Sequence, residues 1–181
     1  YQLFARAYGT NNLPDSSNMC HESTSVGLQE SIGVPVGTVT LKDFEHTDCL
    51  LFFGQNVGSN SPRMLHQLQE ARQRDVPIIT FNPLKERGLQ EFVNPQSPGE
   101  MLGPNSTQIS TQYHQVAIGG DTAAIIGVSK ALLDLHDAAR QRGEPGVLDM
   151  PFIAEHTSGA DDFIAHVRGQ DWAVSYTHLT L

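Results

Sequence analysis

Two short apolar runs, DCLLFF at residues 48–53 and VPIITF at residues 76–81, decide the fold class of this chain of 181 residues. Each run is nearly continuous in its hydrophobicity, and each ends at a turn signal, Gly54 after the first and Asn82-Pro83 after the second. Such runs are typical of strands covered on both faces in a parallel sheet. We therefore predict two buried strands, with Cys49 as a core residue of the first.

Helical patterns separate and follow these strands. Residues 62–74 place apolar side chains on one helical face, and residues 122–140 form the longest pattern. The apolar stripe of this long helix consists of Ala124, Ile125, Val128, Leu132 and Leu135. We also predict helices at 22–32 and, in two pieces broken near Gly159, at 152–167, a third strand at 115–118 and a short edge strand at 38–41. This order predicts an α/β fold, a three-layer Rossmann-like domain with a mostly parallel sheet.

The charge balance excludes several classes of protein. The chain has 20 acidic and 11 basic residues, a formal net charge of -9, which argues against a protein that binds nucleic acid by neutralising phosphates. No apolar run approaches the roughly 18 residues that a membrane span needs. Two cysteines, Cys20 and Cys49, are too few for a disulfide-rich scaffold or a four-cysteine metal site. Because no signal-peptide pattern is present, we expect a cytoplasmic location.

The domain organisation follows from length and composition. A chain of this length predicts one domain, which we place at residues 1–172. The last stretch, residues 173–181, departs from the preceding composition, and we interpret it as a scar or an unrelated tail. Residues 92–112 are polar, rich in proline and long for an ordinary connection, which indicates a functional or interface loop. The first residue is not Met, so we expect a piece of a longer chain.

Small polar residues follow each of the three predicted strands. Glycines in such loops let backbone N–H groups approach an anion, and the helix that follows adds a favourable positive end. Lys85 and Arg87 add charge-assisted bonds to phosphate. Ordinary strand-to-helix turns also need Gly and Asn, so any one loop alone indicates little. Three of them at corresponding strand ends favour a nucleotide-like ligand, although neither a P-loop nor a G-x-G-x-x-G fingerprint is present.

Cys20 is the second chemical signal. It lies beside His21, just ahead of a predicted helix, and both a helix start and a protonated His favour the thiolate that binds a metal or attacks carbon. A buried, inert cysteine is the alternative. Adjacent residues face one another poorly, so Cys20 and His21 are a poor nucleophile–base pair, and the other histidines lack metal-ligand spacing.

Four segments together resemble the molybdopterin oxidoreductase superfamily, and within it the branch of the formate dehydrogenase alpha subunit. They are NMCHESTSVGL at 18–28, FFGQNVGSNSPRM at 52–64, FNPLKERGL at 81–89 and IGGDTA at 118–123. Each is weak alone, but their order and spacing are specific, and the resemblance runs from residue 1 to about residue 172. It implies one inner α/β domain of a large catalytic subunit that binds molybdenum through two molybdopterin guanine dinucleotides.

The resemblance also implies roles for particular residues. Cys20 is the expected protein ligand to the metal, and His21 the residue that assists proton transfer. The residues expected to hold the phosphates of one dinucleotide are Gly54, Asn56, Ser59, Asn60 and Ser61. Those expected around its guanosine are Asn82, Pro83 and Lys85, and those of a third contact loop are Gly120, Asp121 and Thr122. The implied reaction is a two-electron oxidation of a small substrate, formate by analogy, with the redox partner left open.

Two departures from the family pattern matter. The superfamily usually has an acidic residue where Asn82 stands, so guanine recognition by Asn82 is in doubt. The ligands of the family's [4Fe-4S] cluster are expected outside this chain, and the chain alone is expected to be inactive. Two other functions stay open: a nucleotide-binding module without a catalytic metal, and a transferase or hydrolase that depends on Cys20.

Overall fold

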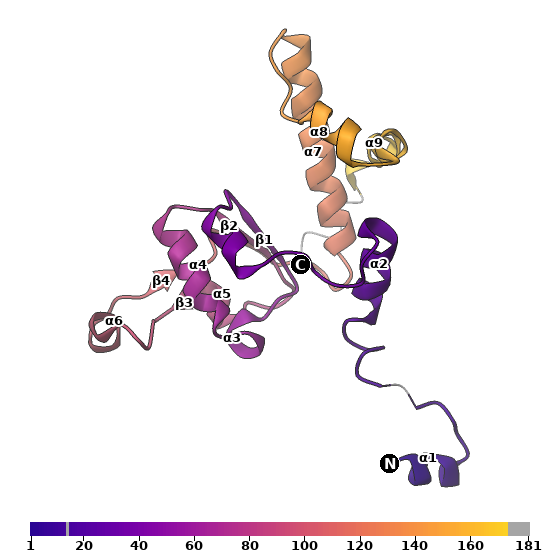
Figure 1. Ribbon diagram of the computed structural model, residues 1–181, viewed down its shortest axis with the longest axis vertical. Helices are drawn as coiled ribbons and strands as arrows, with labels where there is room; N and C mark the ends of the chain where they lie inside the picture. Colours follow the sequence, from indigo (N-terminus) through magenta and orange to yellow (C-terminus); the bar gives the residue numbers. More distant parts are fainter. Residues whose placement is uncertain (14, 174–181) are drawn as a thin grey trace. The chain divides into compact units, whose positions relative to one another are not determined.

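A computed structural model describes residues 1–13 and 15–173 of the chain (Figure 1). It divides into two compact units, residues 1–43 and residues 44–181. In the first unit, helix α1 spans Gln2–Tyr8 and helix α2 spans Glu22–Ile32. Helix α2 has the predicted bounds. Each helix ends at a glycine in the left-handed region, Gly9 at φ 92° and Gly33 at φ 79°, where a side chain would be strained.

The edge strand predicted at residues 38–41 does not form. The carboxylate of Asp43 accepts hydrogen bonds from the backbone N–H and the hydroxyl of Thr40, at 2.6 and 2.8 Å. This local bonding gives the backbone an alternative to strand pairing and opens the 3₁₀ helix η1, Leu41–Glu45. The prediction was wrong because a Thr–Asp pair three residues apart favours a turn over the β-propensity of Val39 and Thr40.

Three parallel strands form the sheet of the second unit, in the order β1-β2-β5. They are β1 (Leu50–Phe53), β2 (Ile78–Phe81) and β5 (Gln112–His114). The third strand begins three residues earlier than predicted, because Thr111 sets its register: the Thr111 N–H donates to the Ile78 carbonyl at 2.8 Å, and the Ile78 N–H donates to the Thr111 hydroxyl at 3.1 Å.

Helices contact both faces of this sheet. On one face, Leu65 and Leu68 of α4 (Met64–Gln73) lie in a buried cluster with Ile78, against which Leu50 and Phe52 pack. On the other face, Ala124 of α7 (Asp121–Gln141) lies in a cluster with Phe81 and Val116. Alternate residues of a strand point to opposite faces, so these are two separate cores. The α/β fold with a parallel sheet between helical layers is therefore confirmed.

The second face is less covered than the sequence predicted. Leu51 of β1 is 54% exposed, so this strand is not buried on both faces within the described residues. Cys49 is exposed and lies just ahead of β1, which corrects its assignment to the core. In the long helix only Ala124 of the predicted stripe is buried. The other four members are 42 to 58% exposed: Ile125, Val128, Leu132 and Leu135.

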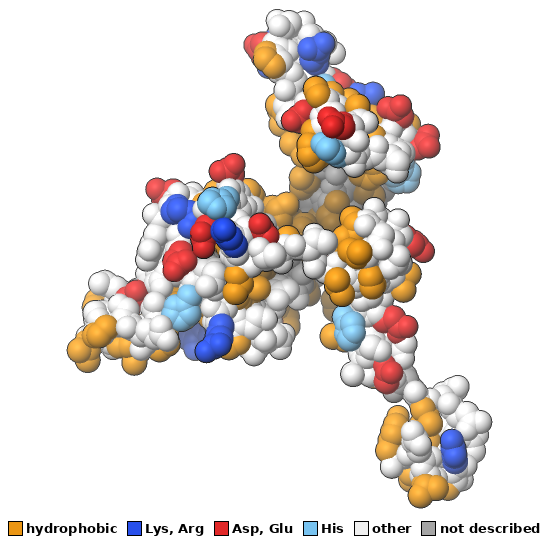
Figure 2. Space-filling model, viewed as in Figure 1, with side chains coloured by type: hydrophobic (Ala, Val, Ile, Leu, Met, Phe, Trp, Pro, Cys, Tyr) orange, Lys and Arg blue, Asp and Glu red, His pale blue; other side chains and the backbone are white. Residues whose placement is uncertain are grey.

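The segment predicted as a long polar loop has structure of its own. It contains the antiparallel pair β3 (Glu91–Phe92) and β4 (Thr107–Gln108), with α6 (Pro98–Leu102) between them. The buried side chain of Gln69 in α4 donates to Thr107 Oγ1 at 2.8 Å and to both carboxylate oxygens of Glu100. Leu102 at the tip is 91% exposed, and Figure 2 shows apolar side chains over α6.

Two further helices follow α7. They are α8 (Met150–His156) and α9 (Ala160–Gly169), and the break between them falls at Gly159, as predicted. Arg168 donates to both carboxylate oxygens of Asp137 at 2.9 and 2.8 Å, which fixes α9 against α7. Among the described residues, no helix is long and apolar enough to cross a membrane. Most of the predicted tail, residues 174–181, lies outside the described part, and the boundary near residue 172 stays a prediction.

A contact between two glycines joins the segments that follow β1 and β2. Each segment contains one turn of helix, α3 (Val57–Asn60) and α5 (Arg87–Gln90). Gly58 and Gly88 meet backbone to backbone, so that a Cβ atom added at Gly88 would lie 2.6 Å from the Gly58 Cα atom. Backbone at that distance cannot yield as a flexible side chain would, so Gly88 requires glycine, whereas a Cβ atom at Gly58 would make a tight contact of 3.0 Å with the Gly88 Cα atom.

We predict that Gly88→Ala forces the two turns apart and destabilises the chain by about 1 to 3 kcal/mol, as overpacking does. Urea unfolding followed by circular dichroism measures the change. Gly99→Ala is the matched control, because a Cβ atom there has nothing within 4 Å. Equal losses for the two variants would contradict the role of the glycine contact.

Candidate functional site

The three segments that follow the parallel strands meet at one edge of the sheet. We call residues 54–61, 82–88 and 115–122 the strand-end loops. Hydrogen bonds join the first two: the Gly54 N–H donates to the Phe81 carbonyl at 2.9 Å, and the Asn82 amide donates to the Gln55 carbonyl at 3.2 Å. The Asn56 amide also donates to Glu86 Oε2, at 2.9 Å. The structure thus brings together two of the loops that the sequence singled out.

The third loop and its strand are joined to the second. The Asn82 N–H donates to the His114 carbonyl at 3.0 Å, and the Gln115 amide donates to the Pro83 carbonyl at 3.2 Å. Tyr113 Oη donates to the Leu84 carbonyl at 2.6 Å and accepts from the Glu86 N–H at 3.0 Å. Sequence reasoning missed Tyr113 and Glu86. No signal marked them, because one lies within a strand and the other stands between two basic residues.

The amide groups of Asn56 and Asn82 are already engaged within the protein. Asn56 Oδ1 caps α3 by accepting from the Ser59 N–H at 3.1 Å, and its amide nitrogen donates to Glu86 Oε2. Asn82 is only 5% exposed, and its Oδ1 accepts from the Leu84 N–H at 3.2 Å. Both side chains therefore shape the loops. Their predicted contact with a ligand stays a prediction.

Other groups at this edge remain available to a ligand. Gly54 (φ 63°) and Gly119 (φ 80°) have no atom within 4 Å of the place where a Cβ atom would stand, so their backbone is open to a ligand. Asp121 Oδ1, at the start of α7, is buried and has no hydrogen-bond partner, which costs free energy that a donor from a bound group would recover. The exposed polar side chains are Ser59, Asn60, Lys85 and Thr122; Ser61 and Pro83 are partly buried and Gly120 is buried.

Cys20 and His21 belong to the first unit. Cys20 is an exposed free thiol, which excludes the buried, inert alternative. His21 is the N-cap residue of α2, but its imidazole makes no capping bond and stays free for other chemistry. A turn precedes the pair: Asp15 Oδ1 accepts from the Ser17 hydroxyl at 2.5 Å and from the Ser17 N–H at 2.9 Å. The Ser17 hydroxyl bond, followed by backbone bonds, lowers the pKa of Asp15.

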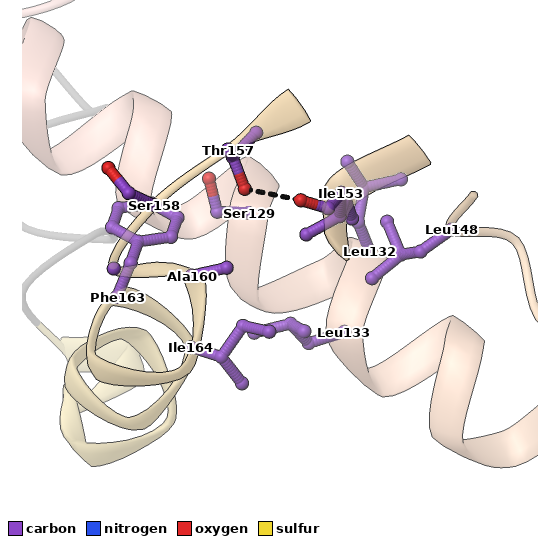
Figure 3. A pocket seen from close by; sticks show the side chains of 11 residues that line it. Ser129, Leu132, Leu133, Leu148, Ile153, Thr157, Ser158, Ala160, Phe163 and Ile164 are labelled. Atoms are coloured by element: carbon purple, nitrogen blue, oxygen red, sulfur yellow. Dashed lines mark hydrogen bonds between the residues drawn. The ribbon is translucent and has the colours of Figure 1, made fainter. Parts of the chain in front are cut away.

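The described residues hold no group of three His, Cys, Asp or Glu side chains that could bind a metal ion without another ligand. A hollow of about 330 Å³ lies between α7, α8 and α9 (Figure 3). Leu132, Ile153 and Phe163 line it, and Thr157 Oγ1 donates to the Ile153 carbonyl at 2.7 Å. No titratable side chain lines the hollow, so it offers apolar packing rather than catalysis.

Comparison with known proteins finds relatives much longer than this chain. Protein YdeP of Escherichia coli is 50% identical over 172 residues, 95% of this chain and 23% of that protein. The uncharacterized oxidoreductase Rv2900c of Mycobacterium tuberculosis is 42% identical over 163 residues, 90% of this chain and 20% of that protein. The chain thus spans about a fifth of the length of these two relatives. No protein-family model matches it.

Two further likenesses are more distant. The F420-dependent formate dehydrogenase 1 subunit alpha of Methanococcus maripaludis is 30% identical over 84 residues, 46% of this chain and 12% of that protein. The solved structure of acetylene hydratase from Pelobacter acetylenicus covers 96% of this chain, and 21% of its own, at a TM-score of 0.59 and 18% identity, a likeness of fold. Together the matches support the resemblance to the molybdopterin oxidoreductase superfamily; the formate dehydrogenase branch stays a prediction.

We predict that Tyr113→Phe loosens the second strand-end loop and lowers the free energy of unfolding by about 1 kcal/mol. Burial, with a further contribution from the Glu86 carboxylate, raises the pKa of Tyr113 above its ordinary value of 10.0. A raised folded pKa contributes stability that is fully present below pH 10 and is lost as pH rises through the folded value. The deficit of the variant should therefore shrink in urea titrations at about pH 11 relative to pH 8. A difference in unfolding free energy between Tyr113→Phe and the wild type that is the same at both pH values would contradict this prediction.

We also predict that Asn82→Asp destabilises the chain by about 1 to 3 kcal/mol, because a carboxylate cannot donate to the Gln55 carbonyl and would face it unpaired. Urea unfolding measures the loss. Asn60→Asp, at an exposed position in the neighbouring loop, is the control and should change stability by less than about 0.5 kcal/mol. An Asn82→Asp protein as stable as the wild type would show that this amide does not tie the loops.

Proposed function

We propose that this chain is the section of a molybdopterin-dependent oxidoreductase that holds one end of the cofactor, with a chemistry like that of formate dehydrogenase. The observation that carries the proposal is the bonding of the strand-end loops into one edge, in a chain homologous to larger proteins named as oxidoreductases. In doubly wound sheets, ligands bind beyond the carboxyl ends of the strands. The runner-up, a nucleotide-binding module without a metal, would use the same edge.

The residues at this edge fit the dinucleotide part of such a cofactor. Phosphates need N–H donors that can approach closely, and the lack of a side chain at Gly54 and Gly119, with nothing within 4 Å of a Cβ position there, lets a ligand come close to the backbone. Neutral donors and one cation would come from Ser59, Asn60, Ser61, Lys85 and Thr122. Asp121 Oδ1 lacks a donor, which a ribose hydroxyl or a base N–H would supply. Asn56, Asn82 and Pro83 would act through the shape of the loops.

Cys20 would supply the protein ligand to the metal. A soft thiolate suits such a centre, and this thiol is free and exposed. His21, whose imidazole makes no capping bond, would accept the proton that leaves the substrate at a ring nitrogen. When bound, the cofactor supplies the two-electron exchange with a small substrate, for which we propose formate. The molybdopterin guanine dinucleotide form and a [4Fe-4S] cluster held outside this chain, together with further subunits, belong to the same proposal.

We predict that Cys20→Ser in the complete gene product lowers the rate of formate-dependent dye reduction by about 100-fold or more. Mutating residues that merely support the ligands of a metal site typically lowers activity 10- to 100-fold, and a ligand itself should matter at least as much. The measurements are dye reduction with formate and elemental analysis for molybdenum. Cys49→Ser is the matched control, since Cys49 is also an exposed free thiol but lies just ahead of β1.

Three outcomes separate the possibilities. Molybdenum-loaded wild type without formate-dependent dye reduction would reject formate as the substrate. Unchanged molybdenum content and activity in Cys20→Ser would reject Cys20 as the ligand and favour the binding module. Alkylation of Cys20 that abolishes an activity in protein without molybdenum would favour a cysteine-dependent transferase or hydrolase.

A further inference from the structure

Strand β1 has an open side. Among the described residues it pairs with β2 alone, so it is the outermost strand on that side of the sheet. The Leu50 N–H donates to the Pro77 carbonyl at 3.0 Å, on the side where β2 lies. Because successive residues of a strand direct their backbone groups to opposite sides, the N–H groups of Leu51 and Phe53 point away from β2. We call this the open side of β1.

The composition of β1 is that of an interior strand. All four of its residues are apolar, LLFF at 50–53, and Leu51 is 54% exposed. The strand at the opposite end of the order, β5, carries exposed Gln112 and His114, whose side chains hydrogen-bond to each other at 3.1 Å. Outermost strands are usually protected from pairing by charged residues, proline or bulges, and β1 has neither charge nor proline. Its open side therefore favours a further strand.

The connections between the strands indicate where such a strand belongs. The connections from β1 to β2 and from β2 to β5 lie on the α4 face, because Leu68 of α4, Leu89 of α5 and Ile109 ahead of β5 share one buried cluster. Helix α7 leaves β5 on the opposite face, where Ala124 packs with Phe81. Crossovers between parallel strands are right-handed in nearly all proteins, so the direction across the sheet reverses when the crossover changes face. The next parallel strand after α7 is therefore expected beyond β1.

The position of α7 agrees with this direction. A hollow of about 330 Å³ lies between the helix and the sheet, lined by Ile125 and Val128 of α7 and by Leu51 and Phe53 of β1. The helix that leaves β5 thus faces the strand at the far side of the sheet. Every strand among the described residues is already placed elsewhere, and α9 is bound back onto α7 through Arg168. The matched region, however, is only 23% and 20% of two relatives, so much sequence remains to supply a strand.

We propose that the open side of β1 binds a parallel β-strand from a section of the complete gene product beyond these 181 residues. The backbone groups of Leu51 and Phe53 would pair with it, and an apolar strand would continue both faces of β1. Where adjacent strands send their connections to opposite faces of an open α/β sheet, a crevice for ligands forms beyond their carboxyl ends. The added strand would form one wall of such a crevice beside residues 54–61. The pairing needs no bound cofactor, so it goes beyond the proposed function.

Hydrogen exchange of the complete gene product, resolved to single amides by mass spectrometry, tests the pairing. The Phe52 N–H is the internal reference, because it lies on the β2 side of the strand. If a strand is bound, the N–H groups of Leu51 and Phe53 have acceptors of their own. We therefore expect their protection factors to lie within about 10-fold of that of Phe52.

The Tyr113 N–H is the matched control on the other outermost strand. The Asn82 N–H donates to the carbonyl of His114, next along β5, so the Tyr113 N–H points away from β2, as those of Leu51 and Phe53 do from theirs. We expect the Tyr113 N–H to be protected about 100-fold less than these two.

Two results would overturn the proposal. One is protection of Leu51 and Phe53 about 100-fold weaker than that of Phe52, whatever the protection of Tyr113, because β1 would then have no neighbour on its open side. The other is protection that disappears on dilution while sedimentation shows a dimer dissociating, because a second copy would then supply the strand. Either result would leave the proposed function intact.

Discussion

The hydrogen bonds of one buried residue, Asn82, hold the carboxyl edge of the sheet together. Its backbone N–H donates to the carbonyl of His114 in β5, and its amide nitrogen donates to the carbonyl of Gln55 after β1. Its amide oxygen accepts from the Leu84 N–H two residues along the chain. One residue, through its backbone and its side chain, thus links three strand ends, in a place where unpaired polar groups would be costly. The glycine contact between α3 and α5 depends on the same geometry, because both turns must approach to backbone distance.

This constraint changes the meaning of the polar residues that the sequence offers. Asn56 and Asn82 look alike in the sequence, as small polar residues after buried strands, yet both direct their amides into the protein. The side chains that remain for a ligand are those that this bonding leaves over, among them Lys85 and Thr122. The shape of this edge is therefore fixed by backbone and amide hydrogen bonds within the protein, and few side chains remain to determine ligand specificity.

Sequence reasoning predicted the elements set by hydrophobic pattern, such as α2, α4, α7 and the first two strands. It placed β5 three residues late, because the register depends on Thr111 bonding to Ile78, a contact between segments 33 residues apart. It assigned Cys49 to the core because the apolar run gives no sign of where pairing begins. Glu86 and Tyr113 could not be found, because their importance comes from a bond across the fold rather than from a local pattern.

The Asp121 carboxylate at the edge fits the same picture of a ligand with a charged end and a neutral end. A chain with a net charge of -9 does not attract phosphate by its overall field, so any phosphate must be bound by local donors. Asp121 Oδ1 is buried without a partner, which is unfavourable unless a donor arrives. Backbone donors near such an acceptor favour a molecule that is anionic in one part and carries N–H or O–H groups in another, as a nucleotide does. Simple inorganic phosphate would satisfy the donors but leave this carboxylate oxygen unpaired.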